Sequence, residues 1–148
     1  MSNWTIRTAN LDDAEGLENC MRAAYSFYDE RMVDQILPPL VIDYAYEIRN
    51  YPTWVAESDG KIVGGLIMSF ENSRATLSNI AVDPCFQGHG LGRGILEFAE
   101  KKATELGFNK IHLATHELLT ENLAIYKHLG WKEAGREEPK IFFEKEIS

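Results

Sequence analysis

The chain has 148 residues, 45% of them hydrophobic and 26% charged, which fits a single soluble domain, residues 1–148, with a sizeable core. The formal net charge of −8 argues against non-specific nucleic-acid binding and favours cationic partners such as amines, although solubility alone also explains it. No apolar run reaches membrane length and no secretory signal is evident, so we expect a cytoplasmic protein without a membrane partner. Cys20 and Cys85 match no metal-ligand spacing, so reduced thiols and no metal site are expected.

The first third of the chain predicts a strand followed by two helices. Alternation in "TIRTA", residues 5–9, is typical of a strand. Asn10 or Asp12 can cap a helix that runs to about Tyr28. After a proline pair, a second helix is expected to end before Pro52, because the residue that precedes a proline disfavours helical geometry.

The middle of the chain predicts an antiparallel meander. The segments "TWVAES" and "KIVGGLIMSFE" flank Asp59 and Gly60, a pair suited to a type I′ hairpin turn. The residues "ENSR" form the next turn, and "RATLSNIAV" forms a third strand that leads into a glycine-rich stretch.

The last third predicts a long helix, a strand, a short helix and two final strands. The long helix carries one helical stripe formed by Leu91, Ile95, Phe98, Lys102 and Leu106. Gly107 stops it, "KIHLAT" follows as a strand, and a short helix runs from about Thr120 to Gly130. "WKEAGRE" and "KIFFEKEI" are the final strands, and the mixed order predicts an α/β or α+β sheet domain.

The stretch "VDPCFQGHGLGRGIL", residues 82–96, places glycines at every second position from 88 to 94, where the long helix begins. A helix N-terminus offers unpaired N–H groups and partial positive charge to a phosphate, and glycines let the phosphate approach the backbone. Neither G-x-G-x-x-G nor the P-loop's Gly-Lys followed by Ser or Thr is present. The stretch therefore predicts a phosphate-binding turn that is neither of the Rossmann nor of the P-loop kind.

Two motifs carry a resemblance to a known family. Gln87, Gly90 and Gly92 spell Q-x-x-G-x-G, and residues 122–131 read N-x-x-x-Y-x-x-x-G-W, one residue shorter than the pattern N-x-x-x-x-Y-x-x-x-G-F and with Trp in place of its Phe. From about residue 54 to residue 145 the sequence resembles the GCN5-related N-acetyltransferase (GNAT) family. The preceding residues fit the variable substrate-side region of that family.

The resemblance implies a GNAT fold of the α/β (α+β) class. Its mixed, mostly antiparallel central sheet is flanked by about four helices and splayed between the fourth and fifth strands. The implied activity is direct transfer of an acetyl group from acetyl-coenzyme A, as co-substrate, to a primary amine in a ternary complex. A non-catalytic acyl-coenzyme A sensor and an unrelated phosphate-binding module stay open as alternatives, and the resemblance allows a homodimer.

The resemblance also implies a set of residues that bind acetyl-coenzyme A. They are Ile80, Ala81, Val82, Gln87, Gly88, His89, Gly90, Leu91, Gly92, Arg93, Asn122 and Tyr126. Main-chain groups of residues 80–82 would bind pantetheine as an added strand, and N–H groups of residues 87–93 would face the pyrophosphate. Arg93 would add a charge contact or lie exposed on its helix, and Asn122 would bind pantetheine or cap its helix.

For catalysis, the resemblance implies that the phenol of Tyr126 protonates the leaving thiolate, with core packing as the alternative role. Some relatives carry a glutamate in the strand before the glycine motif, but residues 76–79 of this sequence contain no base. Glu117, His116 or a chain of water molecules remain open as the proton acceptor.

The acceptor amine would be a small molecule or a peptide, bound by the first two helices, the turn between them and the C-terminal strands. The candidates are Tyr25, Tyr28, Asp29, Glu30 and Arg31, with the segment "YAYEIRNY". Aromatic rings and carboxylates together suit a cation, although the same residues would also suit helix packing and a solvated face.

Overall fold

A single sheet of seven strands organises the computed structural model, which describes residues 3–26 and 42–147. The strands are β1 (Thr5–Thr8), β2 (Thr53–Ser58), β3 (Lys61–Ser69), β4 (Ala75–Val82), β5 (Lys110–His116), β6 (Lys132–Glu137) and β7 (Lys140–Glu146). They lie in the order β1-β2-β3-β4-β5-β7-β6. The pair β4–β5 is parallel and the other pairs are antiparallel, which confirms the mixed, mostly antiparallel sheet.

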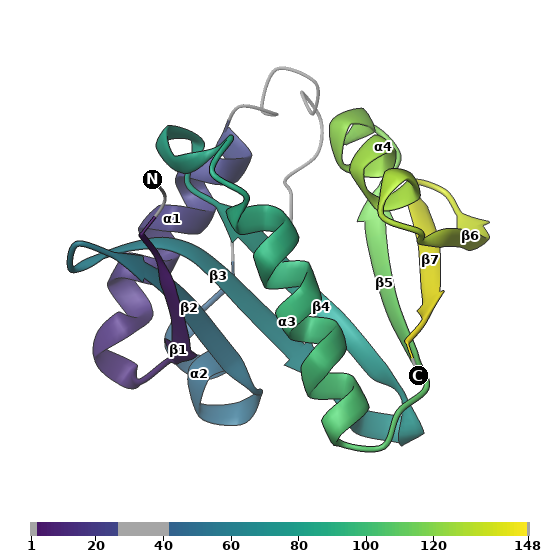
Figure 1. Cartoon of the computed structure of the whole chain (residues 1–148), viewed down its shortest axis with the longest axis horizontal. Coiled ribbons are helices and arrows are strands. Elements are labelled where there is room, and N and C mark those ends of the chain that lie inside the picture. Colours follow the sequence, from purple (N-terminus) through teal and green to yellow (C-terminus); the bar gives the residue numbers. More distant parts are fainter. Residues whose placement is uncertain (1–2, 27–41, 148) are drawn as a thin grey trace.

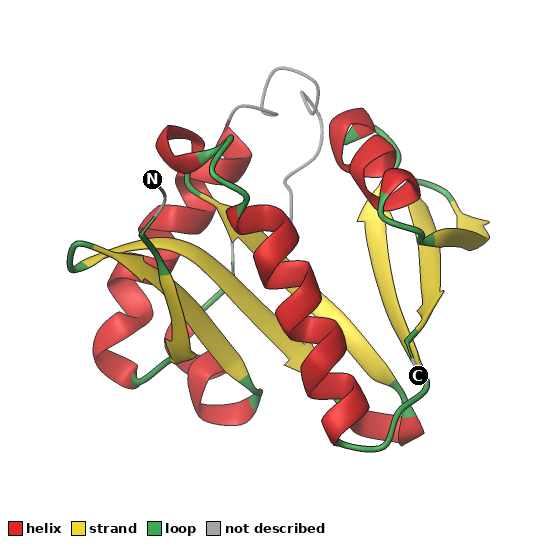
Figure 2. Ribbon diagram, viewed as in Figure 1, coloured by secondary structure: helices red, strands yellow, loops and turns green. Residues whose placement is uncertain are grey.

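Helices cover both faces of this sheet (Figures 1 and 2). They are α1 (Ala14–Ser26), α2 (Tyr44–Asn50), α3 (Leu91–Glu105) and α4 (Thr120–His128). Buried residues of α3 and α4 pack in one hydrophobic core, and those of α1 and α2 pack in a second core on the opposite face. The sheet therefore separates two layers of helices.

The buried stripe of α3 differs in part from the stripe expected from the sequence. Leu91 and Ile95 are buried as predicted, and the stripe continues through Ala99 and Ala103. Leu106 is 59% exposed. Leu106 is the C-cap residue just beyond the end of α3, so it does not continue the buried stripe.

The Asp59–Gly60 hairpin is confirmed, because both residues have positive φ angles, 51° and 77°, as a type I′ turn requires. At the start of α1, Asn10 is the capping residue. Its side chain accepts from the N–H of Asp12, at the first turn of a short 3-10 segment. Asn10 rather than Asp12 therefore begins the helical region.

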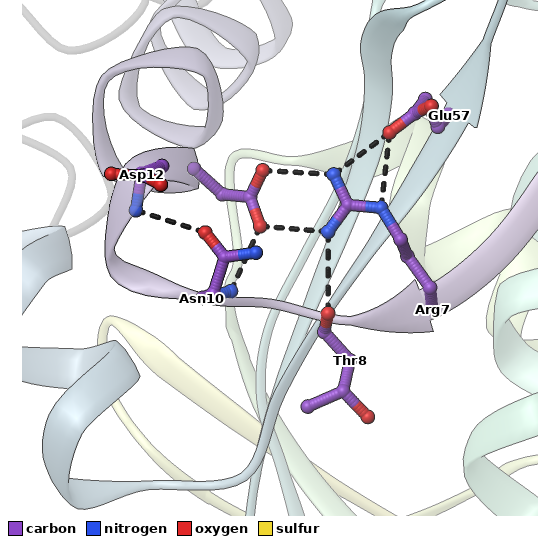
Figure 3. A network of polar contacts seen from close by, with 6 residues as sticks. Arg7, Thr8, Asn10, Asp12 and Glu57 are labelled. Carbon is purple, nitrogen blue, oxygen red and sulfur yellow. Dashed lines mark hydrogen bonds and ion pairs between the residues drawn. The ribbon is translucent and has the colours of Figure 1, made fainter.

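An Arg7-centred network joins β1, the helical entry and β2 (Figure 3). The guanidinium of Arg7 forms two hydrogen bonds to Asp13, of 2.8 and 2.9 Å, and two to Oε1 of Glu57, of 3.0 and 2.7 Å. Asp13 also accepts from the N–H of Asn10 at 2.8 Å. The side chain of Asp13 is only 9% exposed, so the network fixes this corner of the fold.

We expect Asp13→Asn to lower the free energy of unfolding by about 1–3 kcal/mol at pH 7. Hydrogen bonds from Arg7 lower the pKa of the Asp13 carboxyl in the folded protein. This stabilisation is therefore present above the unfolded-state pKa of about 4 and is lost as pH falls through the lower folded-state pKa. Urea unfolding between pH 2 and pH 7 should show a smaller acid dependence in this variant, and an unchanged one in the exposed control Asp12→Asn. An equal reduction of the acid dependence in both variants would contradict the prediction.

Candidate functional site

The sheet opens between β4 and β5. These strands pair only from Ala75–Leu77 to Ile111–Leu113, although β4 continues to Val82 and β5 to His116. Figure 1 shows the two strands diverging toward the end of the sheet where α3 begins. The splay between the fourth and fifth strands is therefore confirmed.

A β-bulge lies where the strands separate. In the ladder with β3, Asn79 faces Ile67 and Leu77 faces Met68, so Ser78 is the extra residue. Leu77 is also the last β4 residue paired with β5. Because a bulge bends its strand and increases its twist, it accounts for the turning of β4 away from β5.

The main-chain groups of β4 alternate between β3 and the gap. The N–H of Asp83 donates to the carbonyl of Val63 at 2.8 Å, and the ladder alternation then directs the groups of Ala81 toward β3. Those of Ile80 and Val82 point away from β3. In agreement, the hydroxyl of Tyr25 on α1 donates to the carbonyl of Ile80 at 2.7 Å. Of the three predicted residues, Ile80 and Val82 thus offer main-chain groups to the gap.

The part of β4 that is not paired with β5 leads directly into the glycine turn. Asp83 accepts from the N–H of Cys85 at 2.8 Å and begins a short 3-10 segment, Pro84–Phe86. Gly88 and Gly90 follow with φ angles of 85° and 78°, which other residues rarely adopt. Gly90 is the N-cap of α3, so the left-handed turn sets the direction of the helix.

The N-terminus of α3 presents unpaired donors at this turn. The N–H of Gly94 bonds to the carbonyl of Gly90 at 3.0 Å, so the preceding N–H groups of Leu91, Gly92 and Arg93 have no acceptor within the helix. A Cβ at Gly92 would contact only Cγ2 of Val82, at 3.7 Å. This arrangement suits an anion that reaches the end of β4.

Gly94 has another role. A Cβ built at this position would collide with the ring of Trp4. The interpretation that all four glycines admit a phosphate is therefore wrong for Gly94, which instead admits an N-terminal tryptophan onto α3. Trp4 is partly buried against the larger core, and no short-range pattern in the sequence connects it with Gly94.

Side chains of the turn have local partners. The ring of His89 stacks on Phe86 with 4.7 Å between centroids. Arg93 is exposed on the first turn of α3, where its Nε donates to Glu97 at 3.0 Å. Gln87 is exposed at the end of the 3-10 segment. These positions leave the predicted cofactor roles of the three side chains as predictions.

On α4, Asn122 lies half-buried in the first turn and Tyr126 is 6% exposed. The Tyr126 ring packs near Trp131 and Phe143, with centroid distances of 6.0 and 5.8 Å. The packing role of Tyr126 is thus present, and its catalytic role stays a prediction. The position of Trp131 in this contact explains why an aromatic residue ends the motif.

The two predicted bases lie at the end of β5, where His116 is the last residue of the strand and Glu117 follows it. The N–H of Glu117 donates to the carbonyl of Pro139 at 2.8 Å. Nδ1 of His116 accepts from the N–H of Leu118 at 3.1 Å, a bond that protonation of Nδ1 would break. Neither side chain lines the groove described next. The candidates Tyr28, Asp29, Glu30 and Arg31 lie outside the described residues.

A groove of about 560 Å³ lies on the α1/α2 side of the sheet, between α2 and strands β3, β4, β5 and β7. Its floor includes Ser78 and Ala114, which directly follow the last paired residues of β4 and β5. The groove therefore reaches the point where the two strands separate. Its titratable lining residues are Glu47, Tyr51, Glu71, Arg74, His112 and Glu144.

Three of these groups have shifted pKa values, and the charge of Glu71 is the main cause that raises the pKa of Tyr51. Burial, together with the charge of Asp43, raises the pKa of the Glu47 carboxyl. Burial and the charge of Arg74 lower the pKa of His112, which is therefore neutral at pH 7. Glu47 belongs to the segment expected to line the acceptor site. His112 and Arg74 gave no signal in the sequence, because only the strand register brings them to one groove.

Comparison with known proteins identifies the family. A model of the acetyltransferase (GNAT) family matches residues 17–131. The chain belongs to the GNAT family. Within the GNAT family it is 31% identical over 98 residues to the uncharacterized N-acetyltransferase YjgM of Escherichia coli. The aligned segment covers 62% of this chain and 59% of that protein. It is 33% identical over 85 residues to the ribosomal protein bS18 alanine N-acetyltransferase of Escherichia coli, 57% of each chain. The chain thus spans less than two thirds of these relatives.

Solved GNAT structures have the same fold. The PaiA N-acetyltransferase from Thermoplasma acidophilum in complex with coenzyme A superposes with a TM-score of 0.83 and 18% identity, covering 98% of this chain and 99% of that one. The ribosomal-protein-S18-alanine N-acetyltransferase from Escherichia coli superposes with a TM-score of 0.74 and 23% identity, covering 99% of this chain and 95% of that one. Among the described residues, no helix has the length and apolar character needed to span a membrane.

Proposed function

We propose that the protein transfers the acetyl group of acetyl-coenzyme A to a primary amine, directly within a ternary complex. The observation that carries this proposal is the continuity of the site. The gap-facing groups of Ile80 and Val82 lead within a few residues to the unpaired N–H groups at the start of α3. A ligand with an amide-bearing arm and a pyrophosphate matches this order of groups.

The chain's residues fit this co-substrate. The amides of the pantetheine arm would pair with Ile80 and Val82 as an added strand, because these groups point into the gap. The pyrophosphate would accept hydrogen bonds from N–H groups between Gly88 and Arg93. A Cβ at Gly88 or Gly90 would meet no atom within 4 Å, so the space beside the turn is open.

The acceptor would enter through the groove on the other side of the gap. Its floor lies at Ser78 and Ala114, so an amine there is beside the point where β4 and β5 separate. In this proposal Tyr126 donates a proton to the thiolate that leaves, with the buried ring held by Trp131 and Phe143. The acceptor class remains that of a small-molecule or peptide amine.

We expect acetyl-coenzyme A to raise the melting temperature by roughly 5–11 °C at 100 times its Kd. Binding to the native state alone adds about 2.7 kcal/mol to the free energy of unfolding at that saturation. Each 1 kcal/mol raises the melting temperature of a domain of this size by roughly 2–4 °C. Thermal unfolding with acetyl-coenzyme A, ATP and NAD measures the effect and its selectivity. No shift at millimolar acetyl-coenzyme A would refute the proposal.

The acyl-coenzyme A sensor predicts the same shift without turnover. Detection of released thiol with a panel of primary amines separates the two functions. A phosphate-binding module unrelated to acetyl transfer predicts similar shifts with ATP or NAD. Thiol release that depends on an amine supports the transferase.

A further inference from the structure

The carboxylate of Glu47 is unusual among the side chains that line the 560 Å³ groove, called the acceptor groove below because the proposed acceptor enters there. It lies in the middle of α2, where its carbonyl accepts from the N–H of Tyr51 at 2.8 Å. Its side chain lines the groove, yet the Oε2 atom is shielded from solvent and has no hydrogen-bond partner. A buried carboxylate oxygen without a partner costs free energy. Glu47 therefore lines the groove while one of its carboxylate oxygens is covered by protein atoms and left unsatisfied by them.

The charges around Glu47 add to this cost. Asp43 is the N-cap residue of the same helix, and burial and the charge of Asp43 together raise the pKa of Glu47. Glu71 from the β3–β4 connection and Glu144 from β7 line the same groove, opposed by Arg74, with a neutral His112 on β5. The groove is therefore negative at pH 7, and a cationic ligand would relieve the repulsion.

The position of Glu47 complements what β4 lacks. Residues 76–79 of β4 contain no titratable carboxyl, although Thr76 and Ser78 form part of the groove floor. Glu47 lines the same groove from the helix above that floor. A carboxylate is thus present on the acceptor side of the gap, supplied by α2 instead of β4.

We infer that Glu47 binds the ammonium group of the acceptor amine in this groove and accepts its proton before acetyl transfer. The inference rests on the proposed function and assigns the proton acceptor within it. It also assigns the acceptor class as a cationic amine, because the groove has more carboxylates than cations.

The proton and bond changes balance as follows. The ammonium gives one proton to the Glu47 carboxylate, which becomes a carboxylic acid. The free amine attacks the thioester carbon, so that a C–N bond forms and the C–S bond breaks. The nitrogen loses its second proton after the attack, and this proton replaces the one that Tyr126 has given to the thiolate. Glu47 then releases its proton to solvent. Ammonium and acetyl-coenzyme A thus give amide, thiol and one proton.

The test compares Glu47→Gln with Glu15→Gln, which removes an exposed carboxylate on α1 that does not line the groove. Glutamine keeps the size of Glu47 and removes both its charge and its basicity. Against 1,4-diaminobutane, 2-phenylethylamine and an alanyl tripeptide, we expect kcat/KM to fall at least about 100-fold in Glu47→Gln, the low end for general acid–base catalysis. We expect a change below about threefold in Glu15→Gln, because an exposed charge outside the groove contributes little. The Kd for acetyl-coenzyme A should stay unchanged in both.

A matched pair of amines separates a proton acceptor from a packing residue. The amine β,β-difluoro-2-phenylethylamine resembles 2-phenylethylamine in shape but is much less basic, so more of it is unprotonated at pH 7. The loss in Glu47→Gln should be clearly smaller for the fluorinated amine. The acidic limb of the pH profile of kcat/KM should lie above the ordinary glutamate range in the parent protein and disappear in the variant. Equal losses for both amines would overturn the inference.

Binding measured without turnover completes the test. Titration of the three amines into the coenzyme A complex should give affinities at least tenfold weaker in Glu47→Gln than in the parent. If the parent binds acetyl-coenzyme A but none of these amines, the inference is overturned. If acetyl-coenzyme A itself does not bind, the proposed function fails first. Glu47→Gln should melt no lower than the parent, because it removes an unpaired buried charge.

Discussion

Gly92→Val should lower the affinity for acetyl-coenzyme A by roughly 100-fold or more while the protein still folds. The valine side chain would stand at the first turn of α3, beside Val82, in the path proposed for the pyrophosphate. Loss of two charge-assisted hydrogen bonds, each worth about 1.5–3 kcal/mol, corresponds to at least about that factor in Kd.

The fold should accept this change. A Cβ at Gly92 meets only Cγ2 of Val82 at 3.7 Å, an ordinary contact, and valine has a higher helix propensity than glycine. Gly90→Val should also remove binding, but Gly90 has a φ of 78°. A β-branched residue there strains the backbone, so lost affinity and lost stability would be mixed. Gly92 therefore gives the clearer test.

Gly135→Val is the matched control, because Gly135 on β6 has no atom within 4 Å of an added Cβ. Calorimetric titration with coenzyme A gives the Kd, and thermal unfolding without ligand reports the fold. Normal binding by Gly92→Val would show that this turn does not hold the phosphates.

Tyr126→Phe should lower kcat by about 100-fold and leave the Kd for acetyl-coenzyme A nearly unchanged. The ring contacts with Trp131 and Phe143 stay, and only the hydroxyl is lost. A general acid is typically worth about 10²–10⁴ in rate. The low end applies because a thiolate leaves readily and water can partly replace the phenol. The effect should appear in kcat because charge develops on sulfur only during the reaction.

Steady-state kinetics with an amine that the parent protein acetylates measures this effect. Tyr46→Phe serves as control, because Tyr46 is a largely exposed tyrosine on α2 that does not line the groove. Unchanged kcat in Tyr126→Phe, with unchanged cofactor affinity, would leave Tyr126 as a packing residue.

Features set by local chemistry were predictable from the sequence. Asp59 and Gly60 fix a turn type by themselves. The glycine run indicated the turn before α3, but the sequence did not show that only Gly88 and Gly90 of its four glycines have positive φ angles. The splay of β4 from β5 was expected only through the family resemblance. The bulge at Ser78 that accompanies it depends on the pairing with β3, which a single strand does not reveal.

The acceptor groove was the least predictable part of the site. His112 and Glu144 lie opposite each other in the β5–β7 register, and Arg74 reaches the same groove from the end of the β3–β4 connection. Their proximity results from strand pairing between distant segments. Glu47 stood within a segment predicted to line the acceptor site, but its helical position resembles that of any solvated glutamate. Only the burial of Oε2 distinguishes it.

The contact between Trp4 and Gly94 ties together two positions that are 90 residues apart in the chain. A larger residue at position 94 fits only after the tryptophan has been replaced by a smaller side chain, whereas a smaller residue at position 4 needs no prior change. The two positions are therefore epistatic, and the order of substitution matters. Because α3 begins only a few residues before Gly94, evolutionary drift at the N-terminus is coupled by this contact to the helix that starts at the glycine turn.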